Sequence, residues 1–185
     1  MSTKRLTTPL TDEAVRELRA GDRVLINGVI YQARDAAHKR LAALLERGRP
    51  LPFDLRGAVV YYMGPSPARP GHVIGAAGPT TSGRMDAYTP LLLRHGLKGM
   101  IGKGSRSEAV RRAIAEHTAV YLAATGGAGA LLATHVVESE VIAYPELGAE
   151  AIACLVVEDF PAVVVNDCLG ADLYELGRAR FERRA

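Results

Sequence analysis

Tryptophan is absent from the 185-residue chain, and aromatic residues make up only 5% of it. Proteins that bind single-stranded nucleic acid stack bases on aromatic side chains, so this composition argues against such a platform. The net charge of +3, from 23 Lys and Arg against 20 Asp and Glu, is far below the dense basic surface of a DNA-binding domain. We therefore expect no nucleic-acid partner, whereas a mildly basic chain suits a site for a small anion.

Cysteine is scarce as well: Cys154 and Cys168 are the two in the sequence, and they do not share a CxxC spacing. We expect both to be reduced thiols. A protein-held iron–sulfur cluster needs three or four Cys ligands, which this sequence does not supply. The five His residues form neither an HExxH motif nor a Cys/His zinc spacing. We predict no metal ligands in this chain.

Long apolar runs are missing too, since no stretch approaches the roughly 18 residues that a membrane span needs. The opening MSTKRLTTPLTDEAV has neither the apolar core nor the small-residue cleavage site of a secretory signal. We expect a cytoplasmic protein that makes no membrane contact.

What the sequence does contain is typical of a globular domain. Apolar residues at 48% and charged residues at 23% are ordinary values, and no long linker or repeat divides the chain. We expect a single domain over residues 1–185. Strand-like segments dominate the first and last thirds, and strands alternate with helices in between. This order predicts a mixed α/β fold with a mixed sheet, not an all-parallel one.

Local patterns make sharper predictions. Asn27-Gly28 lies between β-branched runs in RVLINGVIYQA (23–33), which is a strong hairpin signal. Pro90 either stands at the first position of a helix that starts near Thr89 or bends a longer helix there. Short strands are expected at 72–76 and near 135–144, 151–158 and 162–166. Helices are expected at 11–19, 34–47, 105–117 and 173–184. A further helix is expected to follow the turn at 78–84 and run to about residue 95, and 126–133 is expected to be a glycine-rich turn that leads into a short helix.

Three glycine-containing turns each lead towards a predicted helix: GPTTSGR (78–84), GKGS (102–105) and GGAGA (126–130). Unpaired N–H groups and the helix dipole make such junctions suitable for anions. None of the turns matches GxxxxGK[ST] or GxGxxG, and one glycine turn alone is most often a tight connection. If the three follow consecutive strands, they meet at one edge of the sheet, where α/β proteins usually bind ligands.

Three basic residues stand at strand–turn–helix junctions: Arg34, Arg84 and Lys103. Each alone is typical of a solvated surface charge. Together around one pocket they would suit a dicarboxylate, because each Arg grips a carboxylate as a planar fork and Lys adds a point charge. Asp35 and Asp86 each stand close in sequence to one of the arginines and could pair with it.

Thr80, Thr81 and Ser82 are the hydroxyls of this region. They either cap the helix that follows or face the substrate. His38 lies one helical turn beyond Arg34 and is either a structural histidine or a member of the pocket. The sequence contains no complete set of catalytic residues. We therefore expect the chain to supply only half of an active site.

GPTTSGRMDAYTP (78–90), GKG (102–104) and GGAGALLA (126–133) resemble the class I fumarate hydratases, in particular their β subunit or C-terminal domain. The β subunit of tartrate dehydratase shares the pattern. Segments 6–41, ELGAEAI (146–152) and VEDFPAVVVND (157–167) fit as well, whereas 166–170 departs from the family. The resemblance implies a swivelling β/β/α domain, and a [4Fe–4S] cluster held by three Cys of a partner α subunit, with α2β2 assembly.

The same resemblance implies roles for individual residues. It assigns Arg34, Arg84 and Lys103 to binding of the substrate carboxylates and Thr80 to the reacting carbon as the candidate base. The implied reaction is the reversible hydration of fumarate to L-malate. Two alternatives stay open: a tartrate dehydratase β subunit, and a non-catalytic module for anion binding or assembly.

Overall fold

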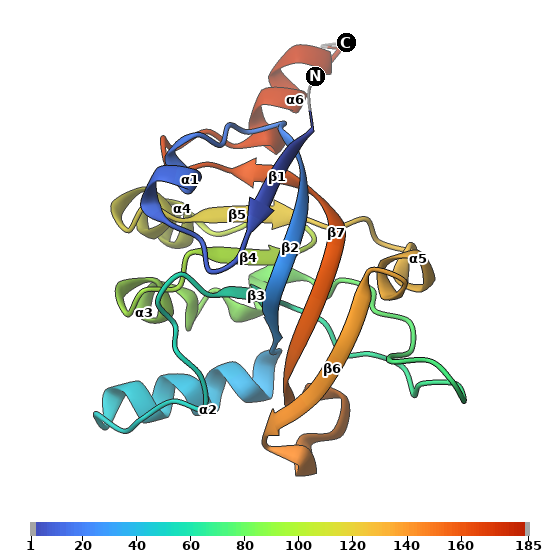
Figure 1. Cartoon of the computed structure of the whole chain (residues 1–185). Helices are drawn as coiled ribbons and strands as arrows, with labels where there is room; N and C mark the ends of the chain where they lie inside the picture. The colour runs from blue at the N-terminus through green and yellow to red at the C-terminus, as the bar shows by residue number, and fades with distance from the viewer. Residues whose placement is uncertain (1–2, 184–185) are drawn as a thin grey trace.

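Residues 3–183, which the computed structural model describes, form a seven-stranded mixed sheet with helices beside it (Figure 1). The strand order is β1-β2-β3-β4-β5-β7-β6, and β2 also pairs with β7, so part of the sheet closes as a barrel. This confirms the mixed α/β class. The strands are β1 (Lys4–Thr7), β2 (Arg23–Gln32), β3 (Val59–Tyr61), β4 (Gly99–Gly102), β5 (Val120–Ala123), β6 (Val136–Ala143) and β7 (Ile152–Asn166).

Strands β1 to β5 run parallel to their neighbours, whereas β7 runs antiparallel to β2, β5 and β6. Alternating side chains along a strand point to opposite faces, and both faces are buried here. Val59 and Tyr61 of β3 belong to a core inside the curved sheet. Val60 and Tyr62 belong to a second core against α2, α3 and α4. This double burial explains why the middle strands contain little but apolar residues.

The helices begin and end close to where the sequence predicts them. Thr11 caps the first helix by accepting a hydrogen bond from the Ala14 N–H, and Ser107 caps the fourth through Val110. Pro90 lies in the first turn of α3, which confirms a helix that starts at Thr89. The helices are α1 (Asp12–Arg16), α2 (Asp35–Glu46), α3 (Thr89–Arg94), α4 (Glu108–Glu116), α5 (Gly129–Ala133) and α6 (Leu173–Phe181), with 3-10 segments η1 (Ser82–Met85) and η2 (Pro145–Glu150).

The hairpin predicted at Asn27-Gly28 is wrong, because β2 continues straight through these residues. Gly28 has a φ of 104°, and the register against β7 shifts between Ile26 and Gly28. The positive φ therefore serves a β-bulge and not a turn. The Asn27 amide also pairs across the sheet with Asp159, donating to its carboxylate over 3.2 Å and accepting its backbone N–H over 3.0 Å.

Other strand predictions were wrong in detail. The segments near 151–158 and 162–166 are one strand, β7, and Asp159 with a φ of 46° lies within it. Residues 72–76 form bends and irregular backbone instead of a strand. Strand β1 was not predicted. The C-terminal helix ends at Phe181, and residue 184 of the predicted helix lies outside the described residues. Among residues 3–183, no helix is both long and apolar enough to cross a membrane.

Candidate functional site

The three glycine-containing turns meet at one edge of the sheet, beyond the carboxyl ends of β3, β4 and β5. The first two turns are joined by backbone hydrogen bonds: Ser82 N–H donates to Lys103 O over 2.9 Å, and Lys103 N–H donates to Thr80 O over 3.2 Å. The third turn is joined to the residue before the first, where Ala77 N–H donates to Gly129 O over 2.9 Å. The prediction that the turns cluster is therefore confirmed, and parallel strand direction is the cause.

Arg34 reaches the same edge from the end of β2, where it is the N-cap residue of α2. Its side chain is 20% exposed, and its Nη2 lies 3.5 Å from Oε1 of Glu150. It runs across the backbone of Gly64, where an added Cβ would lie 2.8 Å from Nη1 of Arg34. Glycine at this position is what allows Arg34 to lie along the loop.

Arg84 and Arg34 are brought together by Asp35. Nε of Arg84 donates to Oδ1 of Asp35 over 2.7 Å, while Oδ2 of Asp35 lies 3.8 Å from Nε of Arg34. Half of the Arg84 side chain is exposed, so its remaining N–H groups are open to a ligand. Sequence proximity paired Asp35 with Arg34, but its hydrogen bond goes to Arg84, and Arg34 lies farther away.

Lys103 is exposed in the turn that follows β4, and its Cδ lies 3.7 Å from the position of a Cβ added at Gly126. Within residues 3–183, its ammonium group forms no ion pair with a carboxylate. A cation without a protein partner at a glycine-lined edge is suited to an external anion.

Thr80 is partly buried, and both of its backbone polar groups are used. Its N–H donates to Tyr62 O over 2.7 Å, and its carbonyl accepts from Lys103. In the described part of the chain the Thr80 hydroxyl has no hydrogen bond of its own. The rigid backbone and the unengaged hydroxyl together leave the side chain available for chemistry.

The capping role expected for these hydroxyls is wrong. Thr81 occupies the N-cap position of η1, but its side chain forms no capping hydrogen bond and is exposed. Ser82 is fully buried instead, and its Oγ lies 2.9 Å from the Tyr121 hydroxyl. That hydroxyl also donates to Gly104 O over 2.8 Å. Ser82 and Tyr121 therefore link the first turn to the second.

Sequence reasoning missed Arg106, which is completely buried beside the site. Its Nε donates to Oδ1 of Asp86 over 2.7 Å and its Nη2 to Oγ1 of Thr89 over 2.8 Å. Its guanidinium also lies 5.3 Å from the Tyr62 ring. Asp86 thus pairs with Arg106 and not with Arg84, contrary to the alternative drawn from sequence proximity. Asp86 and Arg106 are 20 residues apart and follow two turns that the sheet brings together, and this placement is the signal that could have found the pair.

His38 is a buried structural histidine and not a member of an open pocket. It is 0% exposed, and its Nδ1 lies 2.8 Å from the backbone carbonyl of Arg34. Burial lowers the pKa of His38 from 6.5 to about 4, assisted by the charge of Arg106 and opposed by the hydrogen bond to Arg34. His38 is therefore neutral at pH 7 and supports Arg34 through its backbone.

The side chains of this chain do not fit an iron–sulfur cluster. Cys154 lies within β7 and Cys168 just beyond its end. Residues 3–183 contain no group of three His, Cys, Asp or Glu placed to hold a metal ion. Two thiols are fewer than the three Cys that the implied [4Fe–4S] cluster requires.

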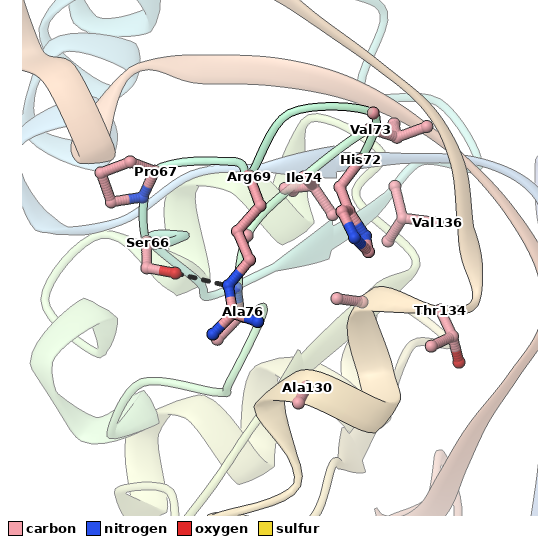
Figure 2. Close-up of a pocket in the computed structure, with 13 residues that line it drawn as sticks. Ser66, Pro67, Arg69, His72, Val73, Ile74, Ala76, Ala130, Thr134 and Val136 are labelled. Carbon is pink, nitrogen blue, oxygen red and sulfur yellow. Dashed lines mark hydrogen bonds between the residues drawn. The ribbon is translucent and has the colours of Figure 1, made fainter.

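A cavity elsewhere in the structure does not coincide with this edge. It has a volume of about 440 Å³ and lies between the loop 66–76, α5 and the start of β6, and none of the four predicted site residues lines it (Figure 2). Ser66 Oγ accepts the Ala76 N–H over 2.9 Å and closes that loop. We place the candidate site at the charged edge instead, because convergent ion-binding groups and not volume identify an anion site.

Comparison with known proteins points in one direction. The family model described as "Fumarase C-terminus" matches residues 2–177. Fumarate hydratase 2 of Leishmania major is 41% identical over 83% of the chain, and the anaerobic class I fumarate hydratase of Escherichia coli is 42% identical over the same share. The chain spans only 28% of the length of each.

A relative of similar length is also found. The putative L(+)-tartrate dehydratase subunit beta of Methanocaldococcus jannaschii is 37% identical over 90% of this chain and 88% of its own length. These named relatives are hydro-lyases. The match over nearly all described strands and helices, and over all three glycine-containing turns, shows that the chain belongs to the fumarase C-terminus family.

Proposed function

We propose that this chain is the β-type part of a hydro-lyase that interconverts fumarate and L-malate. The observation that carries the proposal is the meeting of Arg34 and Arg84 at Asp35, beside the turns that hold Lys103 and Thr80. Two planar guanidinium groups and one ammonium suit a dianion with two carboxylates. The names of the relatives support the choice of reaction.

In this proposal the residues have separate roles. Arg34 and Arg84 bind the two substrate carboxylates, and Lys103 adds positive potential where negative charge develops. The Thr80 hydroxyl exchanges a proton with the carbon next to a carboxylate. A threonine hydroxyl is a weak base in water, and the surrounding cations favour its deprotonated form.

A cluster-bearing α subunit completes the proposed enzyme, in an α2β2 assembly. The support is indirect: the fumarate hydratases are more than three times as long as the matched region, and a relative of matching length is named a subunit. Because this chain's own donors do not fit the [4Fe–4S] cluster, the proposal assigns that group to the partner.

Tartrate dehydration is the second candidate. The relative that this chain covers over 88% of its length is named a tartrate dehydratase subunit. Tartrate is also a dicarboxylate, so the same cations suit both substrates.

The decisive experiment is anaerobic co-expression with the partner chain from the same genome, followed by assays with malate, fumarate and tartrate. We expect turnover of malate and fumarate. Preferred turnover of tartrate would select the second candidate. Tight dicarboxylate binding without turnover of any of the three would identify an anion-binding module and refute the proposal.

The role of Thr80 is tested in the same reconstituted enzyme. Thr80→Ala is expected to lower kcat by about 10²- to 10⁴-fold, the usual contribution of a positioned acid–base group, with a smaller change in KM. Thr81→Ala is the matched control, because Thr81 is exposed and forms no capping bond. Near-normal kcat in Thr80→Ala would remove Thr80 from the mechanism.

A further inference from the structure

Arg34 and Asp35 face each other with two buried polar atoms that have no hydrogen-bond partner among residues 3–183. These atoms are Nε of Arg34 and Oδ2 of Asp35, and they are 3.8 Å apart. A charge-assisted hydrogen bond between such groups normally measures about 2.7–2.9 Å. Two opposite charges at this separation would move together into a direct hydrogen bond unless another group kept them apart.

Glu150 is placed to keep Arg34 and Asp35 apart. Its Oε1 lies 3.5 Å from Nη2 of Arg34, so it attracts the guanidinium without taking up an N–H in a direct hydrogen bond. Its Oε2 accepts the Ala36 N–H over 3.0 Å at the start of α2. A carboxylate at a helix N-terminus is favoured by the helix dipole, so the position of Glu150 does not depend on Arg34.

The segment that carries Glu150 is itself fastened to the sheet. Nε2 of Gln32 donates to Ala149 O over 3.2 Å and to Ala151 O over 3.1 Å, on either side of Glu150. Glu150 belongs to the ELGAEAI segment (146–152), which resembles the family although it contains none of the four proposed site residues. This segment supplies a second carboxylate to Arg34.

A second carboxylate is needed because Asp35 is already engaged by Arg84 through its Oδ1. We propose that Glu150 is a positioning residue that keeps the guanidinium of Arg34 apart from Asp35 and so presents it to a substrate carboxylate. This inference rests on the proposed function for its substrate. Without the charge of Glu150, Arg34 closes onto Asp35 and its fork turns away from the ligand.

The kinetic test uses Glu150→Gln in the reconstituted enzyme. Glutamine still offers an oxygen to the Ala36 N–H, so α2 keeps its capping bond and only the charge is lost. Arg34 binds a carboxylate present in both ground and transition states, so its misplacement weakens binding uniformly. We expect KM for malate to rise about 3- to 30-fold with kcat changed less than about twofold.

The matched control is Glu146→Gln. Glu146 lies in the same 3-10 segment, but it pairs with Arg40, and 60% of its side chain is exposed. We expect unchanged KM in this variant. A general loosening of the segment would affect both variants alike, so an equal rise in KM would overturn the proposal.

A second readout needs no turnover. The Nε–Hε resonance of Arg34, assigned by its loss in Arg34→Lys, is followed by NMR in the purified chain. In Glu150→Gln it is expected to move downfield and exchange more slowly, because Nε–H then bonds to Asp35; in Glu146→Gln it stays in place. An unmoved signal in Glu150→Gln would overturn the proposal, as would an unchanged or lowered KM.

The two arms separate this inference from the proposed function. If the wild-type enzyme turns over no dicarboxylate, the proposed function fails. The NMR arm then still decides whether Glu150 holds Arg34 apart from Asp35.

Discussion

Arg84 and Arg106 belong to two neighbouring turns, the first before α3 and the second after β4, and each pairs with an aspartate over 2.7 Å. Their surroundings differ sharply: half of the Arg84 side chain is exposed, and none of Arg106 is. Arg106 directs its N–H groups at Asp86, Thr89 and Tyr62, whereas Arg84 donates to Asp35 and keeps its other donors open.

The comparison separates an arginine that holds the protein together from one that is ready to bind. A buried cation must have its hydrogen-bonding groups satisfied by the protein. An arginine intended for a ligand needs one anchoring contact and several unused donors. Arg106 joins the turn after β4 to the turn before α3, and the position of Arg84 depends on that joint.

The largest expected effect is on stability at Arg106. Arg106→Ala leaves the carboxylate of Asp86, which is only 15% exposed, without its cation, so we expect the free energy of unfolding to fall by about 3–5 kcal/mol. Arg84→Ala breaks a half-exposed pair and should cost less than about 1 kcal/mol. Urea unfolding of both variants measures the difference. Similar losses at the two positions would show that Arg84 and Arg106 do not differ in their contribution to stability.

The next effect is on activity at Arg84. Arg84→Lys keeps the charge but loses the planar fork, so kcat/KM of the reconstituted enzyme should fall by about 10- to 150-fold. Arg112→Lys is the matched control, since Arg112 is 73% exposed and its one ion pair within residues 3–183 is with Glu108 on its own helix. Small and equal effects would mean that Arg84 is an ordinary surface charge.

Lys98 does not serve as an inert control, although its sequence position suggests one. Its Nζ donates to His117 O over 2.6 Å and lies 2.6 Å from Oδ1 of Asp12. The side chain is only 17% exposed. Lys98→Ala would therefore lose both contacts and cost stability as well as charge.

His38 extends the comparison to a second buried base. Its ring contacts the same Tyr62 ring as Arg106, but His38 is neutral at pH 7. Burial lowers the pKa of His38 to about 4 in the folded state, against 6.5 when unfolded. The unfolded chain binds this proton first as pH falls, so folded stability drops between about pH 6.5 and pH 4. Between pH 7 and pH 5 we expect this histidine alone to lower the free energy of unfolding by about 2 kcal/mol.

The measurement compares the unfolding free energy of the wild type and His38→Asn at both pH values. Asparagine retains a donor for the Arg34 carbonyl but does not titrate. Equal pH dependence in the two proteins would show that the His38 site admits the charged form.

The smallest effect is expected at Thr81. It lies next to Thr80 but is exposed and forms no capping bond, so Thr81→Ala should change the unfolding free energy by less than about 0.5 kcal/mol. Thermal unfolding checks this value. A loss near 1 kcal/mol, as expected for a capping threonine, would indicate a cap that forms in solution.

Much of the local structure was predictable, and where prediction failed the cause was pairing across the sheet. Thr11, Ser107 and Pro90 stand at the starts of their helices, and such starts can be read from the sequence because caps and proline act within one turn of chain. Asn27-Gly28 was misinterpreted, because the same glycine conformation suits a hairpin or a bulge. The choice depended on β7, more than a hundred residues further along the chain.

Periodicity, turn chemistry and charge are local properties, so the mixed α/β class, the three glycine-containing turns and the basic residues at their junctions follow from the amino-acid sequence. Which charges meet follows from the folded arrangement of the strands. It placed Asp35 between Arg34 and Arg84, paired Asp86 with Arg106, and brought Glu150 to Arg34 across 116 residues of sequence. Ion pairs depend on distances of a few ångströms, and those distances are set by how the strands pair.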